Sequence, residues 1–115
     1  MIVQTGLDNI RDKIYDLFVN GVIGTGSTAP LVTDTSLEYE ISGSDLPLNV
    51  KTKGTNQVDI RYSVASSDFN GNSISEFGIT DGSALQVRVT FPTVTKESDS
   101  TLDILYGVKI EQEEI

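Results

Sequence analysis

The chain has 115 residues, which at roughly 100–200 residues per domain predicts one domain spanning residues 1–115. It contains no cysteine and no histidine, so disulfides, thiolate metal sites and a Ser-His-Asp triad are excluded. The 8 basic and 17 acidic residues give a formal net charge of −9, which repels phosphate backbones and anionic membrane surfaces. We therefore expect no enzymatic activity, no cofactor, no nucleic-acid partner and no membrane partner.

One helix is predicted, at about residues 6–20. Apolar residues recur there at helical spacing and form a single stripe, and Gly21 follows as a plausible end signal. The stripe either covers the sheet of its own subunit or packs against the helix of a neighbouring copy. Its candidate interface residues are Ile10, Ile14 and Leu17.

Glycine, proline and small polar residues predict a loop at residues 24–36. The glycines do not match a phosphate-binding loop, because the predicted helix precedes them and no Lys-Ser/Thr ending follows. We interpret the segment as a structural turn.

The first residues of the chain do not have the pattern of a signal peptide. The chain is therefore predicted to fold in a cytoplasm or in a particle assembled there.

From residue 37 to residue 112 the sequence alternates between apolar and polar residues, which is typical of strands with one buried face. Pro92 is expected to end the fifth of these strands. Turn signals at residues 66–72 and at Asp81-Gly82 predict two hairpins. The six predicted strands lie at residues 37–41, 46–53, 58–64, 74–79, 85–91 and 102–110.

These elements predict a mainly β fold, an antiparallel β-sandwich or a closed barrel that carries one N-terminal helix. Alternating residues of three strands are expected to face one core. They are Val58, Ile60, Tyr62 and Val64, then Leu85, Val87, Val89 and Phe91, then Leu102, Ile104, Tyr106 and Val108.

Two groups of residues with side-chain oxygens have the residue types of a functional site. Glu38 and Glu40 point to the same face of a predicted strand, as in a carboxylate hydrolase, although any solvent-facing strand has this spacing. A second group alternates oxygen ligands around a glycine, which makes this turn a candidate calcium site, although the EF-hand spacing is absent. It consists of Asp68, Asn70 and Asn72.

Three strand tyrosines, Tyr39, Tyr62 and Tyr106, either lie half-buried in the sheets or form a stacking platform for carbohydrate. The first reading is the more common one for tyrosines in strands. No residue is predicted to be catalytic.

Four segments in order resemble a group of small virion structural proteins of tailed bacteriophages and tailed archaeal viruses. In that group a short N-terminal helix leads into a GTGTTAP…DTAL.E loop, and strands with I.E.G and F…I.KT motifs follow. The matching segments here are IGTGSTAP at 23–30, DTSLE at 34–38, ISEFGI at 74–79, and FPTVTK at 91–96 with TLDI at 101–104. The turn at residues 97–99 is longer and more acidic than in that group.

The resemblance implies a non-enzymatic structural component of a tailed virus particle, assembled in the host cytoplasm. A place in the tail, as fibre, baseplate or tail-tip attachment, is favoured over the capsid exterior. The alternatives are a capsid decoration or turret protein, or a carbohydrate- or calcium-binding β-sandwich module. The expected partners are other virion proteins and further copies of the same chain, with a trimer favoured.

Overall fold

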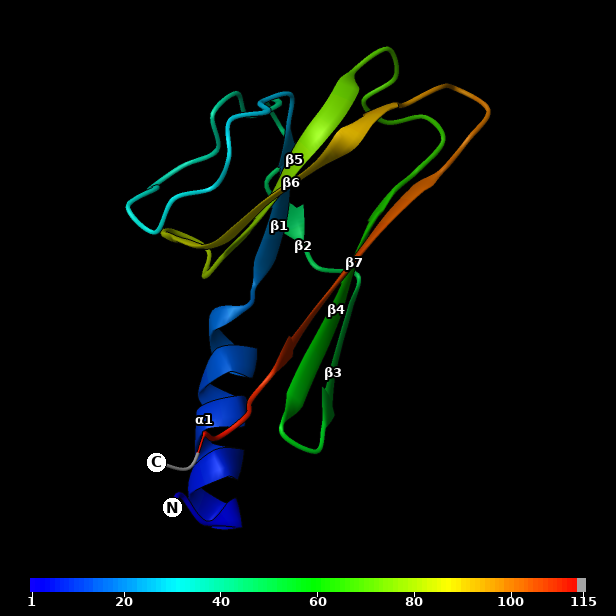
Figure 1. Ribbon diagram of the computed structural model, residues 1–115. Coiled ribbons are helices and arrows are strands. Elements are labelled where there is room, and N and C mark those ends of the chain that lie inside the picture. Colours follow the sequence, from blue (N-terminus) through cyan, green and yellow to red (C-terminus); the bar gives the residue numbers. More distant parts are fainter. Residues whose placement is uncertain (114–115) are drawn as a thin grey trace.

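The structure is a computed structural model that describes residues 1–113, and in these residues one helix precedes seven strands in two sheets (Figure 1). All strand pairs are antiparallel. One N-terminal helix and two packed antiparallel sheets confirm the predicted β-sandwich.

The helix α1 spans Gln4–Leu17, so the predicted end at residue 20 is wrong by three residues. Phe18 leaves the helical conformation, with φ −92° and ψ 90°, and its side chain enters the core. Its ring lies 6.4 Å from the ring of Tyr106, measured between centroids. The helix therefore ends where an aromatic side chain turns inward, and the next residues are used in a strand.

The first sheet has the strand order β2-β1-β5-β6. Its strands are β1 (Asn20–Gly24), β2 (Leu46–Pro47), β5 (Ser73–Thr80) and β6 (Leu85–Thr95). β1 is not among the predicted strands, because four of its five residues are buried and the strand therefore shows no alternation. β1 lies between β2 and β5, and Gly21 allows the Tyr62 ring to approach its backbone, since an added Cβ would lie 2.2 Å from that ring.

The second sheet has the order β3-β4-β7 and is made of β3 (Val50–Gly54), β4 (Gln57–Val64) and β7 (Leu102–Lys109). Burial alternates along both β4 and β7, as the sequence predicts. The two strands pair over their whole length, from Gln57 opposite Lys109 to Val64 opposite Leu102.

Two predicted strands are wrong. Residues 37–41 form no strand and contribute a single β-bridge between Glu40 and Gly24. Residues 46–53 divide between the two sheets, because the chain crosses from one to the other at Leu48 and Asn49. The N–H of Leu48 donates to the carbonyl of Val19, the residue that precedes β1 of the first sheet. The N–H of Asn49 donates to the carbonyl of Arg61 in β4 of the second sheet.

One predicted strand end and one predicted hairpin also differ from the structure. β6 continues through Pro92 to Thr95, because it is an edge strand and its pairing with β5 is irregular at this point. Residues 66–72 link β4 to β5 in the other sheet, so no hairpin forms there. The hairpin at Asp81-Gly82 is confirmed by the pairing of β5 with β6.

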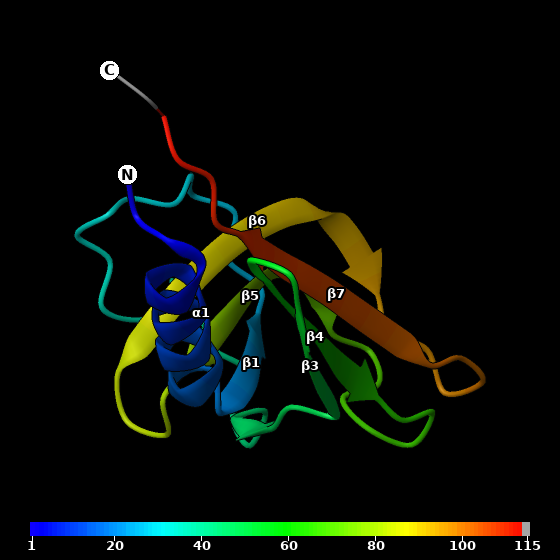
Figure 2. The same ribbon diagram turned by 90° about the horizontal axis from the view of Figure 1, so that it is seen from below.

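The core lies between the sheets and is closed at one end by α1, which contacts β3 and β4 (Figure 2). The inward residues of β4 are buried as predicted, and those of β7 pack against them half-buried. On β6 the predicted Val87, Val89 and Phe91 also pack on the core, whereas Leu85 does not belong to this cluster. The molecule is elongated, with extents of 49 × 27 × 24 Å.

Candidate functional site

The most distinctive feature of the fold is a long irregular segment, residues 25–45, that connects β1 to β2 (Figure 1). Irregular loops longer than about 12–15 residues are uncommon in compact domains and are usually functional or disordered. Here Leu37 anchors the segment, because it is buried and lies against the backbone of Gly78 in β5. The segment is therefore an ordered part of the molecule.

The carboxylate of Glu76 on β5 holds this segment to the sheet. Glu76 is fully buried, and its Oε2 accepts hydrogen bonds from the N–H of Gly26 at 2.7 Å and of Tyr39 at 2.8 Å. Its Oε1 accepts from the N–H of Glu38 at 2.9 Å and from Nε of Arg88 at 3.1 Å. One side chain therefore binds the loop at two places, residue 26 and residues 38–39, and also binds the neighbouring strand β6.

The protonation of Glu76 follows from this geometry. Burial raises the pKa of the carboxyl group, but the N–H groups of Tyr39, Glu38 and Gly26 and the Arg88 guanidinium outweigh burial, so the pKa lies below its usual range. The glycines at 24 and 26 belong to the same arrangement, because a Cβ at either position would lie 2.4–2.6 Å from Glu76 Oε2. The glycine-rich loop thus binds an anion, but the anion is a side chain of the protein itself.

Arg88 extends the network to the tip of the loop. Its side chain is only 5% exposed, and Nη1 lies 3.0 Å from Asp34 Oδ2 while Nη2 donates to the carbonyl of Thr28 at 2.9 Å. Burial lowers the pKa of Arg88, but Glu76 and Asp34 outweigh it and raise the pKa. Asp34 also accepts the N–H of Leu31, which together with Arg88 lowers the pKa of Asp34.

The predicted carboxylate pair is not brought together as a catalytic site. Glu38 accepts the N–H groups of Ser27 and Thr28 and the hydroxyl of Thr28, and its pKa is lowered by the Thr28 hydroxyl and these N–H groups. Glu40 lies in the β-bridge to Gly24. Because all three bonds to Glu38 favour its ionised form, Glu38 is poorly suited to act as a general acid.

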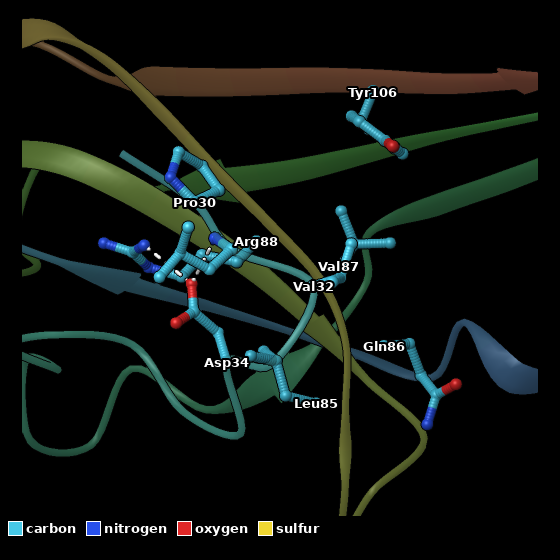
Figure 3. Close-up of a pocket in the computed structure, with 9 residues that line it drawn as sticks. Pro30, Val32, Asp34, Leu85, Gln86, Val87, Arg88 and Tyr106 are labelled. Carbon is cyan, nitrogen blue, oxygen red and sulfur yellow. Dashed lines mark hydrogen bonds and ion pairs between the residues drawn. The ribbon is translucent and has the colours of Figure 1, made fainter. Parts of the chain in front are cut away.

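A surface groove of about 430 Å³ lies between the loop and β6 (Figure 3). The Asp34–Arg88 ion pair forms its polar wall, and Pro30, Val87 and the ring of Tyr106 form the apolar walls. Every buried side-chain nitrogen and oxygen of residues 1–113 has a hydrogen-bond partner. The groove therefore presents no buried polar atom that lacks a partner and would favour a ligand.

The loop exposes two apolar residues at its tip. Leu31 is 64% exposed and Val32 is fully exposed. They belong to the turn in which the N–H of Asp34 donates to the carbonyl of Leu31, and Asp34 forms an ion pair with Arg88. Leu31 and Val32 are thus exposed to solvent on a turn that the Asp34–Arg88 ion pair holds in place.

The calcium candidate contains a bound lysine. Lys96 is 1% exposed, and its Nζ donates to Asn70 Oδ1 at 2.8 Å and to the carbonyls of Ser66 and Glu97 at 3.1 and 2.8 Å. The ammonium group therefore occupies the oxygen that Asn70 would offer to a metal. Asn72 donates its amide to Phe69, and residues 1–113 contain no cluster of three acidic residues that could hold a metal ion.

The three predicted tyrosines do not form one platform. Tyr62 is buried in the core, where its hydroxyl donates to the carbonyl of Ser44 at 2.6 Å, and burial with the nearby acidic charges raises its pKa to about 12. Tyr39 belongs to the loop and is 64% exposed, and Tyr106 lines the groove. The three rings therefore lie in three different environments.

The predicted interface stripe of α1 is divided. Ile14 and Leu17 pack against the core of their own subunit, whereas Ile10 is 39% exposed. Lys51 and Lys53 of β3 lie over the ring of Tyr15 and help to fix the helix. Ile10 is the one member of the stripe with a substantially exposed side chain.

Sequence reasoning missed Glu76, Arg88 and Lys96, which carry most of the buried polar contacts. A charged residue within an otherwise apolar run, ISEFGI at 74–79, was the available signal for Glu76. Comparison with protein-family models, with curated proteins and with solved structures found no match to this chain. Within residues 1–113, no helix has the length and apolar character needed to cross a membrane.

Proposed function

We propose that this chain is a non-enzymatic structural component of a tailed virus particle, located in the tail in preference to the capsid exterior. Its partners are other virion proteins, which it contacts through the tip of the loop at residues 25–45. The proposal rests on the sequence resemblance described above and on the roles that the residues of the resembling segments have in the fold.

The observation that carries the proposal is that these segments serve architecture. The N–H of Gly26 in the first resembling segment and the N–H of Glu38 in the second both donate to the carboxylate of Glu76, which belongs to the third segment. Lys96, the last residue of the FPTVTK segment, fixes the connection between β4 and β5. The motif side chains therefore hold loops in place, which is what a particle protein needs and what a reaction does not require.

The loop tip supplies a surface for neighbours. Exposed apolar residues in an ordered loop lose water when a partner covers them, and the gain is roughly 25 cal/mol for each Å² of apolar surface buried. Leu31 and Val32 lie on a segment held by the Arg88–Asp34 ion pair. Because the loop is already ordered, contact at its tip avoids much of the entropy cost of ordering a flexible segment.

Mass spectrometry of purified virions tests the proposal. We expect the chain in the particle and, after separation of tails from heads, in the tail fraction. Its recovery with heads would support the capsid-exterior alternative, and its absence from particles would refute a structural role.

A variant tests the contact surface. Val32→Asp is expected to leave the purified protein folded, because Val32 has no buried surface, but to reduce incorporation into particles. Thr55→Asp, in the turn between β3 and β4, places the same charge on another exposed loop and should be incorporated normally.

A further inference from the structure

The two sheets end in four edge strands, and their free edges differ in how well they are protected. A free edge offers unpaired N–H and C=O groups to another strand unless it is short, charged or interrupted. β2 has only two residues, and β6 contains Pro92 and an irregular register. Neither provides a long regular edge.

β3 is protected by the helix. It has five residues, and Lys51 and Lys53 lie over the ring of Tyr15, with Lys51 Nζ donating to the Tyr15 carbonyl at 2.7 Å. Lys53 also forms an ion pair with Asp12 at 3.3 Å. Lysines on a short edge strand are a common device against further pairing.

β7 is neither short nor interrupted, and its two charged residues, Asp103 and Lys109, lie near its two ends. It has eight residues, no proline and an uninterrupted register with β4, and it forms the edge of its sheet (Figure 2). Leu105, in the middle of the strand, is 75% exposed. Within residues 1–113, no strand pairs with the other side of β7.

The hydrogen-bond pattern of β4 identifies the free backbone groups of β7. The carbonyl of Arg61 accepts the N–H of Asn49, and the N–H of Ser63 donates to Asn49 Oδ1, so these residues of β4 face away from β7. Because backbone groups alternate along an antiparallel strand, their direct partners on β7 face away from β4. The free edge therefore belongs to Asp103, Leu105, Gly107 and Lys109.

We propose that β7 pairs with β7 of a second copy of this chain, antiparallel about a two-fold axis at Tyr106. In this register Asp103 lies opposite Lys109 of the second copy, and Leu105 lies opposite Gly107, which has no side chain. All four free-edge residues are paired, and both ends of the pair bring opposite charges together. The two three-stranded sheets become one continuous sheet.

Neighbouring registers are poorer. With the axis at Leu105, Asp103 lies opposite Gly107 and the charges are unmatched. With the axis at Gly107, Asp103 lies opposite Glu111, and directly opposed like charges destabilise a sheet. The matching of charge and side-chain size at one axis is why we infer a second copy of the chain as the occupant. This contact does not depend on the proposed virion role.

Charge swaps test the register. Asp103→Lys or Lys109→Asp turns two attractive pairs into two repulsive ones, and we expect about a tenfold rise in the dimer dissociation constant by sedimentation equilibrium. The double variant Asp103→Lys/Lys109→Asp keeps the net charge and should restore the wild-type constant. Mixing the two single variants should give heterodimers, because each Lys then meets an Asp.

Two matched controls separate register from net charge. Asp16→Lys and Lys13→Asp make the same charge changes at exposed positions of α1, outside β7, and should leave the constant close to that of the wild type. Equal weakening by the controls, or no recovery in the double variant, would overturn the register. A chain that stays monomeric at all soluble concentrations, or forms only trimers, would overturn the pairing itself.

Cysteine trapping gives a direct measurement, because the chain has no cysteine of its own. Asp103→Cys and Lys109→Cys proteins, oxidised as a mixture, should form a disulfide-linked dimer, and a reductant should cleave the link. Each variant alone should not, since six residues along a strand separate the two thiols by about 20 Å, far beyond disulfide reach. Cross-linking of one variant with itself and not in the mixture would refute the proposed axis.

Discussion

Replacing Glu76 by glutamine tests whether one buried carboxylate holds the loop at residues 25–45. Glutamine has the same shape but carries an amide N–H₂ in place of one oxygen. In one orientation the N–H₂ faces the N–H groups of Gly26 and Tyr39, and in the other it faces those of Glu38 and Arg88. Both orientations leave two buried donors without an acceptor, so no rotation of the amide rescues the site.

Each buried donor left unpaired costs about 1–3 kcal/mol, and more where the lost partner was charged. We therefore expect Glu76→Gln to lower the free energy of unfolding by about 3–5 kcal/mol, a large part of the 5–15 kcal/mol typical of a domain. At about 4 °C per kcal/mol or more, the melting temperature should fall by at least about 12 °C.

Urea unfolding followed by circular dichroism measures this change. Glu40→Gln is the matched control, because Glu40 is exposed and belongs to the same loop, and its effect should stay within about 0.5 kcal/mol. If Glu76→Gln changed the unfolding free energy by less than about 1 kcal/mol, the carboxylate would not be the anchor and the reasoning would be refuted.

Four further predictions address the same interior. Because the pKa of Glu76 is depressed in the folded state from 4.5, the unfolded chain binds more protons in acid, so the unfolding free energy should fall as pH drops below about 4.5, and this slope should weaken in Glu76→Gln. Gly26→Ala should destabilise by about 1–3 kcal/mol because its Cβ meets Glu76, whereas Gly54→Ala, with its nearest neighbour at 3.7 Å, should be nearly neutral in urea unfolding. The raised pKa of Tyr62, about 12, predicts a late ionisation step in an ultraviolet titration and a loss of stability between pH 10 and 12, where only the unfolded chain releases this proton. Lys96→Met should cost about 2–4 kcal/mol, since three acceptors lose their donor, and a thermal melt unchanged from wild type would contradict the role of its ammonium group.

Elements with one buried face and one solvent-exposed face were predictable from the sequence. β4 and β7 alternate because each has one side in the core and the other in solvent, and the stripe of α1 follows from the same asymmetry. β1 was not predicted because it is buried on both faces, which removes the alternation. The division of residues 46–53 between two sheets was not predicted because alternation along the chain does not indicate which sheet each half joins.

The anchored loop was not predictable from local pattern. Its contacts join residues 26, 38, 76 and 88, and a periodicity within one segment carries no information about partners so far along the chain. The sequence does show a glutamate within an apolar strand. Burial of its charge is unfavourable unless the carboxylate is hydrogen-bonded or protonated. Glu76 finds four, and three of them are backbone N–H groups that any sequence in an appropriate loop could have supplied.

Several of the polar groups that the sequence offers are bound inside the fold, whereas two apolar side chains are exposed on ordered elements. Glu38 is bound to its own loop and Asn70 to Lys96, whereas Val32 and Leu105 are exposed apolar residues on ordered elements. Val32 lies at the loop tip and Leu105 on the free edge of β7, and the loop tip and Tyr106 of β7 line the same groove. Because Val32→Asp changes no residue of β7, we expect this variant to form the β7 pair while losing its place in the particle. If that variant also became monomeric, the loop tip and the strand edge would belong to a single interface, and the two proposals could not both hold.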